Sequence, residues 1–218
     1  MIRRKSVSFS VLGFFILLIG CASISETTQT PGSLEDLPRC YAIFPAEPWE
    51  SVHKIEANIR GLGSYSLLGV IKGEPSERSL QSILLTPEGF VLFEAEFRDD
   101  DLSVRKAVAP FDSPAFARGL MDDVTLLFLS PQEKPTTWRK KTDGTMICQW
   151  EDHYGFRTEV KGSMNTGWRI KYKDRQGEVL KEILLSGPFV NGLASYVELN
   201  ATQPASYQLR MTLLQPSP

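Results

Sequence analysis

The amino-acid sequence predicts a mainly β protein of the α+β class, with about eleven antiparallel strands and two helices. Apolar residues alternate with polar ones along many short segments, which is typical of strands with one buried and one solvated face. Turn-forming residues separate these segments, and Asp143-Gly144 is the clearest hairpin signal. So many antiparallel strands cannot form a flat open sheet. We therefore expect a curled sheet whose concave apolar face is covered by a helix.

Residues 1–20 have the layout of a secretory signal. Arg3, Arg4 and Lys5 precede a mostly apolar run over residues 7–19. A helix that crosses a bilayer needs about 20 apolar residues, and this run is shorter. A cleaved signal peptide is therefore favoured over an uncleaved membrane anchor.

The end of this segment, Leu18-Ile19-Gly20-Cys21, resembles the lipobox of bacterial lipoproteins. The resemblance implies cleavage before Cys21, a diacylglyceryl group on its thiol and further acylation, such as palmitate, on the new amino terminus. Two or more acyl chains give a stable membrane anchor. In a Gram-negative host, Ala22 after the cysteine implies the outer membrane, with the domain on its periplasmic face. The alternative is a secreted protein in which Cys21 has no such role.

The mature chain divides into two parts by composition. Residues 21–39 contain the lipidated cysteine and a Ser-, Thr- and Pro-rich flexible tether, and residues 40–218 form a single domain. Removing residues 1–20 takes away three basic and no acidic residues, so the formal charge changes from −2 to −5. This acidic balance excludes a nucleic-acid partner and shows no evident basic patch for anionic lipid headgroups.

Two cysteines remain in the domain, Cys40 and Cys148. A compartment outside the cytoplasm permits a disulfide between them. Such a bridge would close a loop of about 108 residues and contribute roughly 4–5 kcal/mol in the chain-entropy model. Two buried free thiols are the alternative.

The first helix is predicted over 48–60, because Pro48 suits a first helical position and Gly61 can end the helix. Its apolar stripe, at helical spacing, consists of Trp49, Val52, Ile55 and Ile59. Four strands are predicted after it, at 64–72, 79–86, 90–97 and 102–108.

The second helix is predicted to begin at Pro114 with Ser113 as its cap and to end before Pro131. Its apolar face contains Phe116, Leu120, Met121, Val124 and Leu127. Seven strands follow, at 136–141, 145–151, 155–161, 167–173, 178–186, 193–200 and 206–214.

This pattern resembles the LolA/LolB fold of periplasmic lipoprotein carriers and outer-membrane lipoprotein receptors, over roughly residues 40–215. The supporting motifs are Pro48-Trp49, His53, Tyr65 with Gly69, Thr86-Pro87-Glu88-Gly89 and Phe111-Asp112-Ser113-Pro114. The resemblance implies an unclosed barrel of eleven strands lidded by helices. Receptors of this family carry an exposed hydrophobic residue on a protruding loop, and the corresponding hairpin near 73–78 has none. The sequence therefore favours a LolB-like protein with a different function over a true lipoprotein receptor.

Motifs for covalent catalysis, metal binding and nucleotide binding are missing. No G-x-S-x-G or H-E-x-x-H sequence occurs, and Gly61-Leu62-Gly63 lacks the third glycine of a dinucleotide loop. Two histidines and three cysteines are too few for a Cys/His metal site. We interpret His53 and His153 as surface or hydrogen-bonded residues, and we expect no enzyme activity, cofactor or metal.

The remaining chemistry is hydrophobic, and it predicts a cavity for acyl chains. The candidate lining residues are Leu68, Val70, Leu84, Phe90, Leu92, Phe116, Leu120, Phe128, Trp168 and Ile170. The alternative is that these side chains only fill the core. The function expected from the sequence is non-enzymatic binding of acyl chains or of the lipid moiety of a lipoprotein cargo. A protein-interaction subunit of an envelope complex is the second interpretation.

Overall fold

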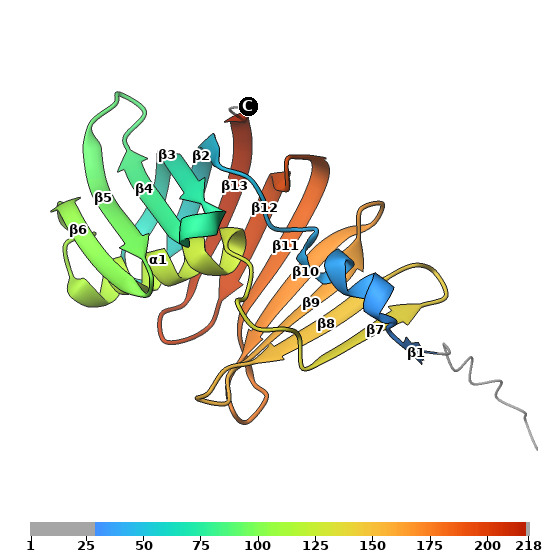
Figure 1. The fold of residues 1–218 in the computed structure, drawn as a ribbon. Helices are drawn as coiled ribbons and strands as arrows, with labels where there is room; N and C mark the ends of the chain where they lie inside the picture. The colour runs from blue at the N-terminus through green and yellow to red at the C-terminus, as the bar shows by residue number, and fades with distance from the viewer. Residues whose placement is uncertain (1–28, 217–218) are drawn as a thin grey trace, which may run out of the picture.

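The structure, a computed structural model, describes residues 29–216 (Figure 1). The predicted signal peptide and Cys21 lie outside the described residues, so cleavage and lipidation stay predictions. Among the residues described, no helix is both long and apolar enough to span a membrane.

Thirteen strands, one α-helix and two 3-10 helices make up the described chain. The strands are β1 (Gln29–Pro31), β2 (Trp49–Ile59), β3 (Gly63–Glu74), β4 (Ser79–Leu85), β5 (Val91–Arg98), β6 (Asp101–Ala107), β7 (Thr137–Lys141), β8 (Met146–Glu151), β9 (Arg157–Ser163), β10 (Gly167–Lys173), β11 (Val179–Val190), β12 (Leu193–Ala201) and β13 (Tyr207–Pro216). The helices are η1 (Leu34–Tyr41), η2 (Pro75–Glu77) and α1 (Pro114–Phe128).

All the strands belong to one antiparallel sheet in the order β1-β7-β8-β9-β10-β11-β12-β13-β2-β3-β4-β5-β6. The two ends of the sheet, β1 and β6, do not pair with each other, so the predicted mainly β, unclosed architecture is confirmed. We call β2–β6 the helix-covered arm, because α1 packs against β4, β5 and β6. We call β7–β10 the disulfide-linked arm, because η1 packs against β7 and β8 there (Figure 1).

The predicted helix over 48–60 is wrong, because this segment is strand β2. Its buried positions alternate, and they include the polar Ser51 and His53 as well as Trp49, Ile55 and Ala57. The two polar residues on the buried face obscured the period of two in the sequence, while the apolar residues also fitted a helical stripe. Among residues 29–216, α1 is therefore the one α-helix, and the two other helices, η1 and η2, are of the 3-10 type.

The second predicted helix is confirmed as α1. The Ser113 hydroxyl accepts a hydrogen bond from the Phe116 backbone N–H at 3.1 Å, which satisfies one of the free donors of the first turn. Pro114 occupies the first helical position. The residues that α1 buries are Ala117, Met121, Asp123, Val124, Leu127 and Phe128.

Residues 29–39 of the predicted tether lie on the sheet. β1 pairs with β7 at the edge, and the indole N–H of Trp138 donates to the Ser33 carbonyl oxygen at 2.9 Å. Gly32 is needed at this contact, because a Cβ there would lie 2.0 Å from the Trp138 ring. The composition of this segment is polar, and its position depends on contacts with residues about a hundred positions away.

A disulfide joins Cys40 and Cys148, with a Cα–Cα distance of 5.8 Å. It links η1 to β8 across a sequence separation of 108 residues. Lys140 on β7 also contacts Asp36 of η1 at 3.3 Å. The N-terminal segment is therefore fixed covalently to the disulfide-linked arm.

Candidate functional site

The inner face of the sheet, under α1 and η1, is the site that the sequence predicts for acyl chains. Four of the predicted lining residues lie there: Leu84 and Phe128 are 6% and 4% exposed, and Trp168 and Ile170 are 4% and 0% exposed. They belong to one continuous hydrophobic core. The structure thus brings together residues from β4, α1 and β10.

Leu68 and Val70, two further candidates, do not face this interior. On β3 they alternate with the buried Leu67 and Ile71, so their side chains lie on the outer face, where they are half-buried. A shift of one residue exchanges the two faces of a strand, and the sequence alone could not assign the faces of β3.

Phe90 also lies outside the interior, and it is 71% exposed. It follows the predicted Thr86–Gly89 turn, which is closed by hydrogen bonds from Gly89 N–H to Thr86 O and from Thr86 N–H to Phe90 O, both 2.9 Å. This turn joins β4 to β5, one hairpin after the 73–78 segment that the resemblance singled out. The remaining candidates, Leu92, Phe116 and Leu120, are partly buried at the margin of the core.

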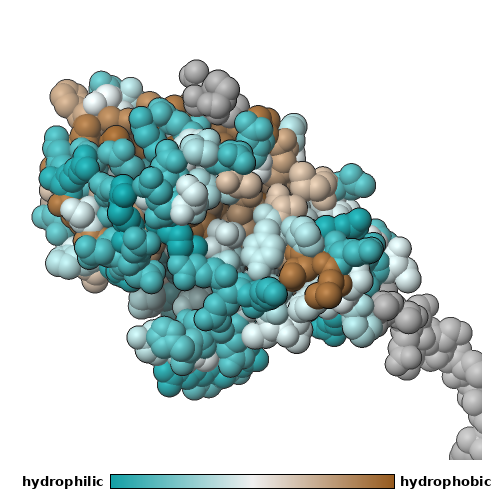
Figure 2. All heavy atoms as spheres, in the orientation of Figure 1, coloured by the Kyte–Doolittle hydropathy of each residue, from teal (hydrophilic) through white to brown (hydrophobic). Residues whose placement is uncertain are grey.

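Packed side chains fill the interior in this state. Several inner-face residues have no accessible surface, so no water-sized void borders them; these are Leu80, Phe93, Ala95, Met121, Val160, Ile170, Ile183 and Leu199. At its surface, the face that carries α1 is mostly hydrophilic, with hydrophobic residues in scattered patches (Figure 2). The side chains around these positions pack as a core, which is the alternative to a cavity that the sequence left open.

A buried polar cluster ties α1 to the sheet. The Asp123 carboxylate on α1 accepts hydrogen bonds from the Lys181 ammonium on β11 and from the Tyr207 hydroxyl on β13. The Asp123 and Lys181 side chains are only 6% and 11% exposed. Burial raises the pKa of Asp123, and its contacts with Lys181 and Tyr207 oppose that rise. We call these three residues the α1 latch, because they join the helix to two central strands.

His53 is a second buried polar group of the inner face, at 1% exposure. Its Nδ1 lies 3.3 Å from the Ser51 hydroxyl, its ring lies 5.9 Å from that of Phe128, and its Nε2 has no hydrogen-bond partner. Burial lowers the pKa of His53 to about 4, so the ring is neutral at pH 7. His153 is exposed and packs on Tyr154, so the two histidines do not share a site.

The outer face of the disulfide-linked arm carries a basic row that the sequence did not reveal. Strand register places Arg139, Ile147, Lys161 and Arg169 side by side on β7, β8, β9 and β10. β7 and β10 each contain three basic residues, β9 contains two and β8 contains none, so the row across the strands forms only when they pair. In the sequence, polar residues alternate with apolar ones along these strands. Only the strand register shows which of the polar residues become neighbours in the sheet. Within residues 29–216, no group of three potential metal ligands occurs.

No family model and no curated protein matches this chain. Among solved structures, it is similar to the LolA superfamily protein NE2245 from Nitrosomonas europaea, with a TM-score of 0.51 and 11% identity. That match covers 84% of this chain and 91% of the other. A putative outer membrane lipoprotein-sorting protein domain from Vibrio parahaemolyticus matches over the same shares, with a TM-score of 0.45 and 9% identity. The first of these two likenesses shows a LolA/LolB-like fold, as the sequence resemblance implied.

Proposed function

We propose that this protein is a lipid-anchored, non-enzymatic envelope protein that holds acyl chains, or the lipid moiety of a lipoprotein, between α1 and the inner face of the sheet. One observation carries the proposal: an apolar helix face covers an apolar, unclosed sheet and is attached to it by a small polar latch. Walls of this kind suit hydrocarbon, because they offer few polar groups that would need partners.

The described state is the closed one, since the interior is filled. An acyl chain enters when α1 lifts and the chain takes over the contacts of Met121, Val124 and Phe128. Flexible methionine side chains adapt to chains of different shape. Transfer needs no covalent step, because differences in buried apolar area, at about 25 cal/mol per Å², set the direction.

The latch sets how easily α1 lifts. Removing one partner of a buried ion pair leaves the other charge uncompensated, which favours states in which that charge reaches water. Lys181 and Tyr207 are on the sheet while Asp123 is on the helix, so a lifted α1 exposes all three groups.

Anchoring follows from the lipobox-like Leu18–Cys21 segment. We propose that acylated Cys21 holds the domain in the outer membrane, on its periplasmic face. Replacing Cys21 with Ser is expected to move the protein from the membrane fraction to the soluble fraction. Continued membrane association of that variant at high salt would contradict lipid anchoring.

Acyl-chain binding is tested with the mature chain that carries Cys21→Ser. Native mass spectrometry and displacement of a fluorescent fatty acid are expected to show bound acyl chains, with greater uptake in Asp123→Asn. The matched control is Asp122→Asn, since Asp122 is an exposed neighbour on α1 that pairs with Arg118 at 3.1 Å. Folded protein without acyl uptake in all three forms would overturn the proposal.

A protein-interaction subunit of an envelope complex is the second candidate function. The packed interior favours it, because a permanently filled core leaves binding to the surface. Under this alternative, Asp123→Asn lowers stability without any gain in acyl uptake. The same experiment therefore separates the two functions.

A further inference from the structure

We propose that the outer face of the disulfide-linked arm is a docking surface for a membrane with anionic lipid headgroups. Its basic side chains are Arg139 and Lys141 on β7, Lys161 on β9, and Arg169 and Lys171 on β10. We call these five residues the basic patch. This inference concerns a different face from the proposed acyl-chain site, and it rests on the proposed Cys21 anchor for the orientation of the domain and, together with the charge of the patch, for the choice of a membrane as partner.

The patch contains a like-charged pair that costs stability. Lys161 and Arg169 lie directly opposite each other on adjacent antiparallel strands. Like charges in this position repel, and a sheet has no structural need for them. A pairing that opposes folding is expected where a surface serves binding.

The nearby carboxylates neutralise only part of this charge. Glu182 is shared by Arg169 and Lys171, at 3.3 and 3.4 Å. Glu159 pairs with Lys173, which lies beside the patch, and it stands opposite Lys171 of the patch on the adjacent strand. Within residues 29–216, no acidic group lies within ion-pair distance of Arg139, Lys141 or Lys161, so at least three cations are available to an external anion.

The surface also has a shape that admits a headgroup. An open depression of about 590 Å³ lies over β9, β10 and β11, and Lys161, Arg169 and Lys171 line it. The hydroxyl-bearing Thr166 and Tyr196 line it as well, together with one carboxylate, that of Glu159, so the three cations outnumber the single anion. Phosphate oxygens accept hydrogen bonds from both kinds of group.

The anchor leaves the sheet beside this patch. In the pairing of β1 with β7, Gln29 lies opposite Lys141 and Pro31 lies opposite Arg139. Eight residue steps separate Cys21 from Gln29, and an extended chain spans at most about 3.5 Å per step. A lipidated Cys21 therefore holds the β7 edge within about 28 Å of the bilayer. The choice of a membrane as partner follows from this proximity and from the positive charge.

The test measures binding of the mature Cys21→Ser chain to vesicles, so that the acyl anchor contributes nothing. This chain retains all residues of the described core. We expect co-sedimentation with vesicles of phosphatidylglycerol and phosphatidylethanolamine, little with vesicles of phosphatidylcholine, and loss of binding at high salt. Each basic residue near an anionic surface contributes about 1 kcal/mol, or about fivefold. Lys161→Gln with Arg169→Gln should therefore weaken binding about 25-fold.

The matched control is Lys54→Gln with Lys72→Gln on the outer face of the helix-covered arm. It changes the net charge by the same amount, and its side chains, 49% and 52% exposed, resemble Arg169 at 50%. Equal losses in the two double variants, or equal binding to neutral vesicles, would overturn the proposal. Acyl uptake is measured without vesicles, so a failure here is distinguishable from a failure of the proposed function.

Discussion

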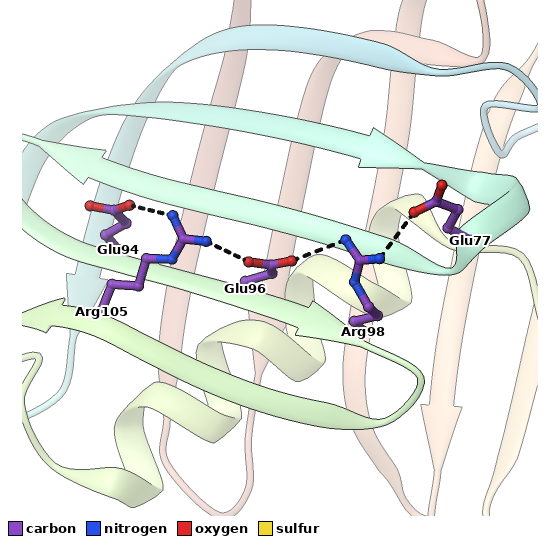
Figure 3. A network of polar contacts seen from close by, with 5 residues as sticks. All are labelled: Glu77, Glu94, Glu96, Arg98 and Arg105. Carbon is purple, nitrogen blue, oxygen red and sulfur yellow. Dashed lines mark hydrogen bonds and ion pairs between the residues drawn. The ribbon is translucent and has the colours of Figure 1, made fainter.

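The two arms of the sheet are covered and charged in different ways. In the helix-covered arm, α1 is held by packing and by the α1 latch, whereas in the disulfide-linked arm η1 is bonded covalently to β8. The outer faces differ too. On β5 and β6, Arg105 lies between Glu94 and Glu96, and Arg98 lies between Glu96 and Glu77 of η2 (Figure 3).

This comparison separates a movable part of the molecule from a fixed one. A helix held by non-covalent contacts can lift, while a segment held by a disulfide stays on the sheet. Each cation in the chain of ion pairs on β5 and β6 has two carboxylate neighbours, so that outer face holds no excess positive charge. On β9 and β10, Lys161 and Arg169 face each other and leave an excess. In our proposals, ligand entry belongs to the helix-covered arm and membrane contact to the disulfide-linked arm.

The largest effect is expected from removing the disulfide. Cys40→Ser with Cys148→Ser should lower the free energy of unfolding by about 4–5 kcal/mol, because the unfolded chain regains the freedom of a long loop. Hydrogen exchange should rise first in η1, β7 and β8. Chemical denaturation with and without reductant measures the change. Equal loss of protection in α1 would contradict the independence of the two arms.

Breaking the α1 latch should have the next largest effect. Asp123→Ala leaves the buried Lys181 ammonium without its partner and is expected to cost about 3–5 kcal/mol. Asp122→Ala, one position away and exposed, is expected to change stability far less. Denaturation of both variants gives the comparison, and protection from hydrogen exchange should fall in α1 while η1 keeps its protection.

Acid should loosen the helix-covered arm through His53. Burial lowers its pKa from 6.5 to about 4, so the folded state favours the neutral ring. The contribution of the neutral His53 ring to the free energy of unfolding is complete above pH 6.5, falls as the pH drops, and is lost by pH 4. The total loss is about 3 kcal/mol. The free energy of unfolding is measured for the native chain and for His53→Leu across this pH range. The difference between the two pH profiles gives the contribution of His53. A native chain whose pH dependence matches that of the variant would show that His53 is not responsible.

The smallest effects are expected on the two outer faces, and with opposite signs. Lys161→Gln removes a cross-strand repulsion and should raise the free energy of unfolding by about 0.2–1 kcal/mol. Glu96→Gln removes an attraction to Arg98 and Arg105 and should lower it by a similar amount. Thermal unfolding at low and high salt measures both changes, which should shrink as salt screens the charges.

The strands after residue 60 were predictable because their alternation is clear and their turns carry strong signals, as at Asp143-Gly144. β2 was missed because Ser51 and His53 occupy its buried face and broke the apolar alternation. β1 and η1 were missed for another reason: their residues are polar, and the disulfide and the contacts of Trp138 fix them. Local pattern thus predicts elements that bury an apolar face, and it fails for elements held by distant partners.

The candidate site likewise has a part that local sequence pattern predicts and a part that depends on distant residues. Leu84, Phe128, Trp168 and Ile170 are buried, as large apolar residues in strands and helices mostly are, while their role in lining an acyl-chain cavity stays a prediction. Whether the interior is hollow or filled depends on how distant side chains pack, which composition does not encode. The basic row needed the strand register: β7 and β10 each carry three basic residues, but only the pairing of the strands brings Arg139, Lys161 and Arg169 onto one row.

The open sheet leaves two margins, and each is unsuited to further strand pairing. β1 has only three residues and ends in Pro31, which offers no backbone donor. β6 carries Asp101, Arg105 and Lys106, and its pairing with β5 contains a bulge. Short length, proline, charge and irregular register all discourage edge-to-edge aggregation. A half-barrel of thirteen strands can therefore remain monomeric without closing on itself.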